Sequence, residues 1–362
     1  MFPKLLTILA FVCTSKSQTN EYNFISESLP PCVCVSPNQC ADNDSLVTGE
    51  DKMDIRIDKQ ECANYLEVCC ENPLEIPSSL IKPMVYRGCG YKTPVEFSPR
   101  ITTDSNLSQF GELPWSVIIM MRDATSPDRN IYRCGGSLIH PEVVMTAAHC
   151  VFGLDHTLLT IRVGEWDTRS QDEPLPHQDT TVREMVINPH FILKSLRNDI
   201  ALLFLNEPVT LRDNVGIICL PPQNFAMDNV MCTASGWGKD TFKRGRHSSI
   251  LKKVDLPLVS REACITSLTK TRLGSFYRLH LSFICAGGEE NKDTCKGDGG
   301  SPLVCPIPNE PNRFFQMGIV SWGIGCGENG TPGVYVNVPM FTNWIDKELA
   351  KRNLDPSTYR YK

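Results

Sequence analysis

The sequence has little net charge and, after its first residues, no long hydrophobic run. The formal net charge is -5 over 362 residues, so nothing indicates a basic surface for nucleic acid or for an anionic membrane. No run beyond the N-terminus approaches the roughly 18 apolar residues of a membrane-spanning helix. Charged residues make up 21% and hydrophobic residues 41%, which is ordinary for a soluble globular protein.

An apolar run at the N-terminus is followed by small polar residues. Lys4 precedes the run from Leu5 to Cys13, and Ser15 and Ser17 come after it. This order is typical of a secretory signal peptide. We therefore expect residues 1–17 to be removed and the mature protein to be secreted.

The cysteines divide the rest of the chain. Their number, 17, is odd, but removing Cys13 with the signal peptide leaves an even set, as expected in an oxidising compartment. Six of them lie in residues 32–70, a module too small to fold on its core alone, so we expect three disulfides there. Sequence alone leaves their pairing open.

The flanking segments have other compositions. Residues 18–31 are polar and predict a short N-terminal arm. Residues 71–100 contain five prolines and Cys89, which predicts a linker. A β-rich domain, 101–362, makes up the remainder.

Short apolar segments separated by turn residues dominate the last domain, without interleaved helices. This pattern predicts an all-β fold of antiparallel sheets closed as barrels. One amphipathic helix is expected near the C-terminus, over residues 342–353. The expected strands include 115–121, 137–139, 143–146, 200–205, 317–322 and 333–338.

Three motifs in this domain resemble those of the trypsin-like serine proteases. The segment Cys295–Cys305 matches the nucleophile loop, Cys-x-Gly-Asp-Ser-Gly-Gly-Pro-Leu, but has Gly299 in place of the nucleophile. The flanks of His149 resemble those of the family's general base, and the flanks of Asp199 those of the carboxylate that orients it. The resemblance covers about 101–362 and implies a trypsin-like double β-barrel with the site between the barrels.

The cysteine module resembles the clip domain of arthropod clip-domain proteases. The shared features are Cys-x-Cys-Val-x-Pro-x-x-Cys, Ile-x-Lys-x-x-Cys and a final Val-Cys-Cys. Another small disulfide knot is the alternative. The two resemblances imply the following pairs: Cys32–Cys69, Cys34–Cys62, Cys40–Cys70, Cys89–Cys219, Cys134–Cys150, Cys232–Cys305, Cys264–Cys285 and Cys295–Cys326.

A glycine at the nucleophile position predicts an inactive enzyme. Gly299 has no side chain that could attack an acyl carbon. Ser301 lies two residues on, or roughly 6–7 Å along an extended chain, whereas a base and its nucleophile must meet at about 2.6–3.2 Å. His149 and Asp199 would then be remnants of a catalytic triad, and a buried His or Asp is in general more often structural than catalytic.

The specificity pocket of the family has counterparts here. Asp293 matches the carboxylate at the floor of pockets that take Arg or Lys. The segments from Ser321 to Gly323 and from Pro332 to Tyr335, which contain Gly323 and Gly333, match the pocket walls. Such a pocket could still bind a basic side chain. The alternative, which we favour, is an inherited feature without a present task.

Two further features are weaker. Glu165, Asp167, Asp172 and Glu173 crowd a loop that binds calcium in some relatives, although a solvated acidic loop explains them as well. No cofactor is certain and calcium is possible. Sequons for N-glycosylation occur at Asn43, Asn106 and Asn329.

A processing site is also indicated by resemblance. In active relatives, cleavage before an isoleucine frees an amino group that pairs with the aspartate preceding the nucleophile. Arg100, Ile101 and Asp298 occupy the corresponding positions. Ile101 is followed by two threonines rather than by the family's Val-Gly-Gly, which makes the inward turn less favourable.

Together, the motifs resemble the clip-domain serine protease homologues of insects, the prophenoloxidase-activating factor and masquerade-like group. The resemblance implies a haemolymph protein that acts as a non-catalytic cofactor in prophenoloxidase activation, in melanisation and innate immunity. Expected partners are an upstream clip-domain protease, prophenoloxidase and, after cleavage, further copies of the chain, but no nucleic acid or membrane. The alternatives are a decoy or adhesion protein that uses the Asp293 pocket, and a protease with unusual chemistry.

Overall fold

The computed structural model describes residues 33–35, 68–70, 87–93, 106–123, 130–170, 173–239 and 247–361. The chain divides into two compact units, Met1–Ile81 and Lys82–Lys362. In the first unit, β1 (Val33–Val35) pairs antiparallel with β2 (Val68–Cys70). The three disulfides expected in this unit, the cleavage site at Arg100 and the sequon at Asn43 lie outside the residues or side chains that are described.

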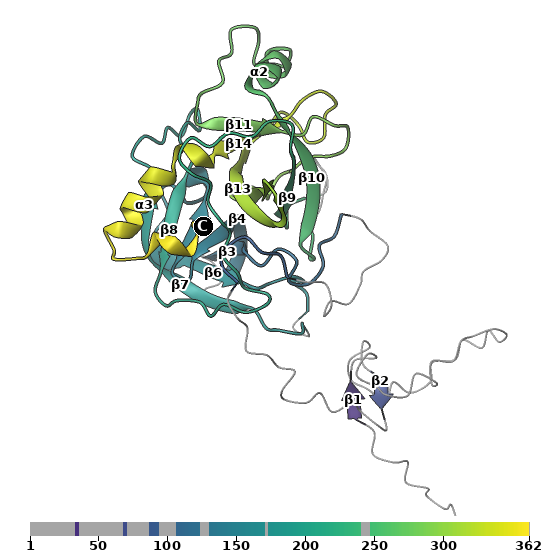
Figure 1. The fold of residues 1–362 in the computed structure, drawn as a ribbon, viewed down its shortest axis with the longest axis vertical. Coiled ribbons are helices and arrows are strands. Elements are labelled where there is room, and N and C mark those ends of the chain that lie inside the picture. Colours follow the sequence, from purple (N-terminus) through teal and green to yellow (C-terminus); the bar gives the residue numbers. More distant parts are fainter. Residues whose placement is uncertain are drawn as a thin grey trace, which may run out of the picture. The chain divides into compact units, whose positions relative to one another are not determined.

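The second unit contains two closed, six-stranded antiparallel barrels (Figure 1). The first barrel has the strand order β3-β4-β5-β8-β7-β6, and the second has the order β10-β11-β14-β13-β12-β9. This is the predicted all-β double barrel. The strands are β3 (Ser116–Arg122), β4 (Asn130–His140), β5 (Val143–Thr146), β6 (Leu159–Val163), β7 (Gln178–Ile187), β8 (Ala201–Leu205), β9 (Met231–Gly236), β10 (Lys252–Val259), β11 (Phe283–Ala286), β12 (Pro302–Ile307), β13 (Glu310–Trp322) and β14 (Gly333–Asn337).

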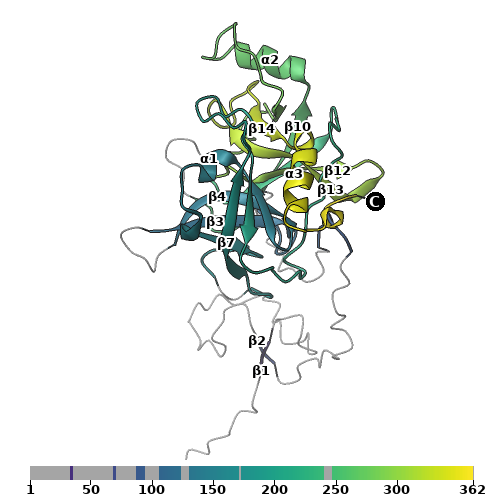
Figure 2. The same cartoon turned by 90° about the vertical axis from the view of Figure 1, so that its left-hand side faces the viewer.

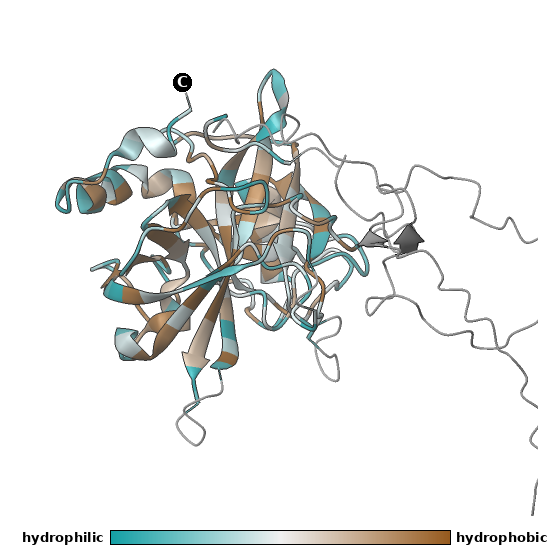
Figure 3. Cartoon of the chain, turned by 90° about the horizontal axis from the view of Figure 1, so that it is seen from below, coloured by the Kyte–Doolittle hydropathy of each residue, from teal (hydrophilic) through white to brown (hydrophobic). Residues whose placement is uncertain are grey.

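Alternation of apolar and polar residues explains how the strands build the core. In β6, Leu159, Ile161 and Val163 are fully buried, whereas Thr160 and Arg162 are half-buried. All five residues of β8 are buried, because this strand is apolar throughout. Figure 3 shows apolar residues along the strands and polar residues at many of the loops and strand ends.

Among the residues that the structure describes, helices are few and short. They are α1 (Ala148–Val151), α2 (Arg261–Thr269), α3 (Thr342–Ala350) and the 3-10 turns η5 (His156–Leu158), η6 (Val338–Met340) and η7 (Pro356–Thr358). The face of α3 that carries Ile345 and Leu349 is buried, and α3 lies on the side that Figure 2 turns to the viewer. Among the described helices, none has the length and hydrophobicity needed to span a membrane.

The predicted C-terminal helix is too long by three residues. It ends at Ala350 rather than at residue 353, because the chain turns at Asn353, which has a left-handed φ of 58°. The amide of Leu354 then donates to the carbonyl of Leu349 and closes the helix end.

Five disulfides join parts of the second unit, and they are the pairs that the resemblance implied: Cys89–Cys219, Cys134–Cys150, Cys232–Cys305, Cys264–Cys285 and Cys295–Cys326. Part of the expected linker belongs to this unit. Cys89 is buried, the amide of Gly90 donates to Ile217, and Gly90 in turn accepts from Phe314. Residues 87–93 are therefore fixed on the barrels.

Candidate functional site

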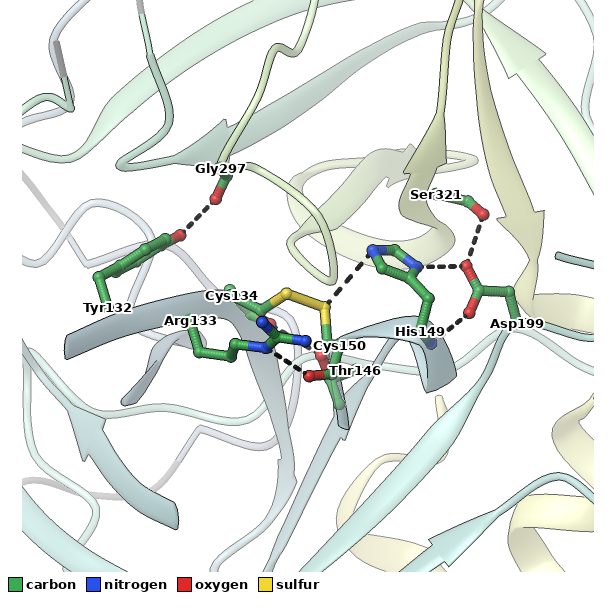
Figure 4. The surroundings of a disulfide bond; sticks show 10 residues. Tyr132, Arg133, Cys134, Thr146, His149, Cys150, Asp199, Gly297 and Ser321 are labelled. Carbon is green, nitrogen blue, oxygen red and sulfur yellow. Dashed lines mark hydrogen bonds and ion pairs between the residues drawn. A yellow bond between two sulfur atoms is a disulfide. The ribbon is translucent and has the colours of Figure 1, made fainter. Parts of the chain in front are cut away.

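Strands β5 and β8 bring the two remaining triad side chains together. Thr146 at the end of β5 pairs with Ala201 at the start of β8. His149 follows the end of β5 and Asp199 precedes the start of β8, so the two residues lie beside each other at neighbouring strand ends. The imidazole Nδ1 of His149 lies 2.7 Å from Asp199 Oδ2, and its backbone amide donates to Asp199 Oδ1 at 2.8 Å (Figure 4). Asp199 is fully buried, which strengthens this contact electrostatically.

A third side chain holds the carboxylate from the other barrel. The hydroxyl of Ser321, in β13, donates to Asp199 Oδ2 at 2.6 Å (Figure 4). The backbone amide of His149 and the hydroxyl of Ser321 both donate to the Asp199 carboxylate. The carboxylate is thereby held in place and can keep the imidazole in one orientation. The sequence indicated Ser321 only as part of a pocket wall, and its contact with Asp199 spans 122 positions.

The other imidazole nitrogen faces the residue that lacks a side chain. A Cβ atom placed on Gly299 would lie 3.0 Å from His149 Nε2 and 3.5 Å from Cε1. In the chain as it stands, Nε2 is 3.7 Å from the sulfur of Cys150 (Figure 4). That sulfur is bonded to Cys134, so these residues offer no thiolate for a metal. The base and its carboxylate are in place, and the hydroxyl is missing.

Ser301 does not supply that hydroxyl. Its side chain is buried, and its Oγ would lie 1.9 Å from a Cβ on Gly135 and 3.1 Å from one on Gly236. It therefore packs against glycine backbone of β4 in one barrel and β9 in the other. Within the described residues, no hydrogen bond joins Ser301 to His149.

The aspartate before the nucleophile position is buried on backbone amides. Asp298 accepts hydrogen bonds from Gly238 and Cys295, each at 2.8 Å. Burial raises the pKa of its carboxyl to about 6, against the opposing effect of these bonds. Ile101, its expected partner after processing, is not among the described residues. A contact that the sequence did not indicate lies nearby, where the hydroxyl of Tyr132 donates to the carbonyl of Gly297 at 2.6 Å.

Asp293 lies close to the backbone of Gly333, and one of its oxygens has no partner among the described residues. Oδ2 accepts from the amide of Gly327 at 3.1 Å, while Oδ1 is buried without a hydrogen bond. A Cβ on Gly333 would lie 2.9 Å from Oδ1, so only glycine leaves this oxygen its space, whereas a Cβ on Gly323 would meet only a carbonyl at 3.6 Å. Burial raises the pKa of Asp293 to about 6. The chemistry suits a cationic group, and its binding stays a prediction.

This carboxyl should make stability depend on pH. Its pKa in the folded state lies above the usual 3.8, so the folded state holds the proton more tightly than the unfolded state. The stabilisation is present below about pH 4 and is lost as pH rises through 6. We expect the free energy of unfolding of Asp293→Asn, relative to that of the wild type, to rise by about 2 kcal/mol from pH 4 to pH 8, as measured by urea unfolding. The exposed Asp213→Asn is the control, and an equal difference at both pH values would contradict the prediction.

The calcium candidates meet only in part. Glu165, Glu173 and His177 place ligand atoms within 4.8 Å of one another, but Asp167 is not in this group and Asp172 is not described. Glu165 Oε2 is held by Arg162 at 3.0 Å and lies 3.3 Å from His177. Burial and the facing Glu165 raise the pKa of Glu173 to about 7. An ion here would be held by Glu165 and Glu173. It would compete with the guanidinium of Arg162 for the carboxylate of Glu165, so calcium binding stays a prediction.

Comparison with known families agrees with the fold and the site. The trypsin family model matches residues 104–345, and a model described as the serine protease clip domain of the PPAF-2 type matches residues 23–71. The chain is a clip-domain serine protease homologue. The resemblance inferred from the motifs is thereby confirmed.

Three similar relatives are insect proteins. The chain is 49% identical to phenoloxidase-activating factor 2 of Galleria mellonella over 76% of its own length and 93% of that protein. It is 36% identical to inactive CLIP domain-containing serine protease A8 of Anopheles gambiae, over 85% of each chain. It is 38% identical to inactive CLIP domain-containing serine protease A28 of the same species, over 83% and 81%.

Proposed function

We propose that this clip-domain homologue is secreted, has no protease activity and acts as a cofactor in a prophenoloxidase-activating cascade of the haemolymph. The observation that carries the proposal is the oriented His149–Asp199 pair facing Gly299, which has no side chain. A site of this form can position a polypeptide but cannot form an acyl-enzyme. The names of the relatives support the same role, since one is a phenoloxidase-activating factor and two are called inactive.

Reconstitution tests the cofactor role. A clip-domain protease and prophenoloxidase are mixed with and without this protein, and phenoloxidase activity is measured. We expect the activity to rise severalfold only when the homologue is present. Equal activity in both mixtures would remove the proposal.

Processing should be needed for that activity. Arg100–Ile101 and the buried Asp298 occupy the two ends of the family's activation switch. Without a nucleophile, the new amino terminus would reshape a binding surface rather than an active site. We expect Arg100→Gln to remain uncleaved and to lose most of its cofactor activity, while Arg122→Gln, on an exposed strand end, keeps it. Full activity without any cleavage in residues 71–100 would contradict this.

After cleavage, the clip unit should stay attached if the cut follows Cys89, because Cys89 is bonded to Cys219. Gels run with and without reductant distinguish the two cases.

Processed copies are also expected to associate, and the mass in solution before and after cleavage measures this.

A decoy is the second candidate, favoured by one observation. The buried Oδ1 of Asp293 has no partner in the described part of the chain, and a guanidinium or ammonium group could satisfy it. A decoy should bring down protease inhibitors from haemolymph, whereas a cofactor should bring down phenoloxidase. Asp293→Asn should abolish the first result and leave the second unchanged.

A further inference from the structure

Two surface segments carry only positive charge. Residues 188–198 and 266–283 contain no aspartate or glutamate, although the chain as a whole has a net charge of -5. Their basic residues are His190, Lys194, Arg197, Lys270, Arg272, Arg278 and His280. Such a concentration in an acidic protein creates a local positive field.

The two segments lie side by side. The amide of Asn198 donates to the hydroxyl of Ser282 at 3.1 Å. Leu196 packs against the small hydrophobic cluster that also contacts Leu273 and Tyr277. Arg197 is close enough to lower the pKa of His280, after the larger effect of burial. Figures 1 and 2 both show the adjoining helix α2 projecting at one end of the second barrel.

The cations of these two segments are unpaired within the described part of the chain. Lys194, Arg197, Lys270, Arg272 and Arg278 are exposed, and none of them forms an ion pair with any residue that the structure describes. Several basic residues elsewhere are paired, as Arg162 is with Asp179 and Arg352 with Glu184. The positive electrostatic potential of the two segments therefore faces solvent.

Apolar side chains stand among these cations. Phe276 is 93% exposed, Leu281 63%, Leu193 51% and Ile192 48%. Large side chains in these positions are uncovered, whereas most of the barrel's apolar residues are buried. We call the exposed residues of 188–198 and 266–283 the basic–apolar surface.

This surface adjoins the candidate site. Asn198 directly precedes Asp199, and Trp322 directly follows Ser321. The ring of Tyr277 packs edge-on against Trp322, with centroids 6.2 Å apart. Phe152 directly follows the helix that carries His149, and its ring packs edge-on against the ring of Phe191, with centroids 5.5 Å apart.

We propose that the basic–apolar surface docks an acidic segment of a partner protein that also carries apolar side chains. Charge complementarity argues for the acidic groups, because five exposed cations form no ion pair with any described residue. The four exposed apolar side chains argue for a polypeptide, since a sulfated polysaccharide would cover none of them favourably. The inference goes beyond the cofactor role, because it names the chemistry that the partner must present.

The test uses a defined probe, a fluorescent peptide in which Asp and Phe alternate with Gly, read by anisotropy. We expect the triple variant Lys194→Glu, Arg197→Glu and Arg278→Glu to weaken binding at least about tenfold. Binding should also weaken with added salt, as expected for exposed charges. The matched control is Arg122→Glu, Arg169→Glu and Lys347→Glu, which makes the same charge change at exposed positions outside the surface.

A second comparison tests the apolar part. Phe276→Ser with Leu281→Ser should weaken peptide binding severalfold, whereas Met231→Ser with Ile131→Ser should not, although these residues are also exposed. Equal losses in the surface and control triples would overturn the proposal. So would binding of a heparin oligosaccharide or polyglutamate that is as tight as that of the mixed peptide. The assay contains no phenoloxidase, so its failure would leave a positive reconstitution result standing.

Discussion

Replacing Gly299 by serine should turn the processed, inert protein into a slow hydrolase of arginyl amide substrates. We expect the wild type to hydrolyse the substrate no faster than buffer alone. The rate with Gly299→Ser should exceed the buffer rate by about 10²-fold or more, since loss of the nucleophile lowers kcat by a factor on the order of 10⁶. The base is already oriented, because His149 is held by Asp199 and Asp199 by Ser321. By resemblance, Asp293 is the carboxylate that should receive the arginyl side chain.

Geometry limits how much activity returns. A Cβ on residue 299 would be 3.0 Å from His149 Nε2, so the imidazole must move by a few tenths of an ångström. Recovery should therefore be partial, and active-site titration of the processed variant with a serine-directed phosphonate measures the competent fraction.

Three controls isolate the hydroxyl. Gly299→Ala adds the same Cβ and should stay inert, and Gly299→Ser combined with His149→Ala should lose the gain. Ser301→Ala should change nothing in the wild type. Phosphonate labelling of the wild type that disappears in Ser301→Ala would show that Ser301 is the nucleophile and would contradict the prediction.

Strand positions followed from the sequence where apolar residues alternate with polar ones, but strand lengths did not. β4 begins at Asn130 and β13 at Glu310, several residues before the apolar segments that predicted them. The outer ends of these extensions are exposed or half-buried and are held by backbone pairing, as Asn130 pairs with Arg122 of β3 and Glu310 with Ile307 of β12. No local pattern in a sequence records such pairing.

The site was predictable as a set of motifs but not as a set of contacts. Flanking residues identified His149, Asp199 and Gly299. The bond from Ser321 to Asp199 and the burial of Ser301 between the barrels depend on residues far apart in the chain. The basic–apolar surface combines two segments about 70 positions apart, so neither segment alone would indicate it.

Gly135 should be among the least replaceable residues of the protein. A Cβ at this position would lie 1.9 Å from the Oγ of Ser301 and 3.0 Å from its Cβ, where two barrels meet. The amide of Gly135 also donates to the carbonyl of Gly299 at 2.9 Å, and its carbonyl accepts from Thr146, so the strand cannot shift freely. We expect Gly135→Ala to lower the free energy of unfolding by about 3 kcal/mol or more.

The family pattern has glycine where this chain has Ser301, which gives a matched test of the cause. In the background of Ser301→Gly, the nearest clashing atom is gone, and the cost of Gly135→Ala should fall by about 2 kcal/mol. The remaining cost comes from the Cα of residue 301, 3.1 Å from the added Cβ. Urea unfolding of the wild type, both single variants and the double variant measures the coupling. If the cost of Gly135→Ala is the same with serine and with glycine at 301, then the Oγ does not lie against Gly135, and the buried position assigned to Ser301 is wrong.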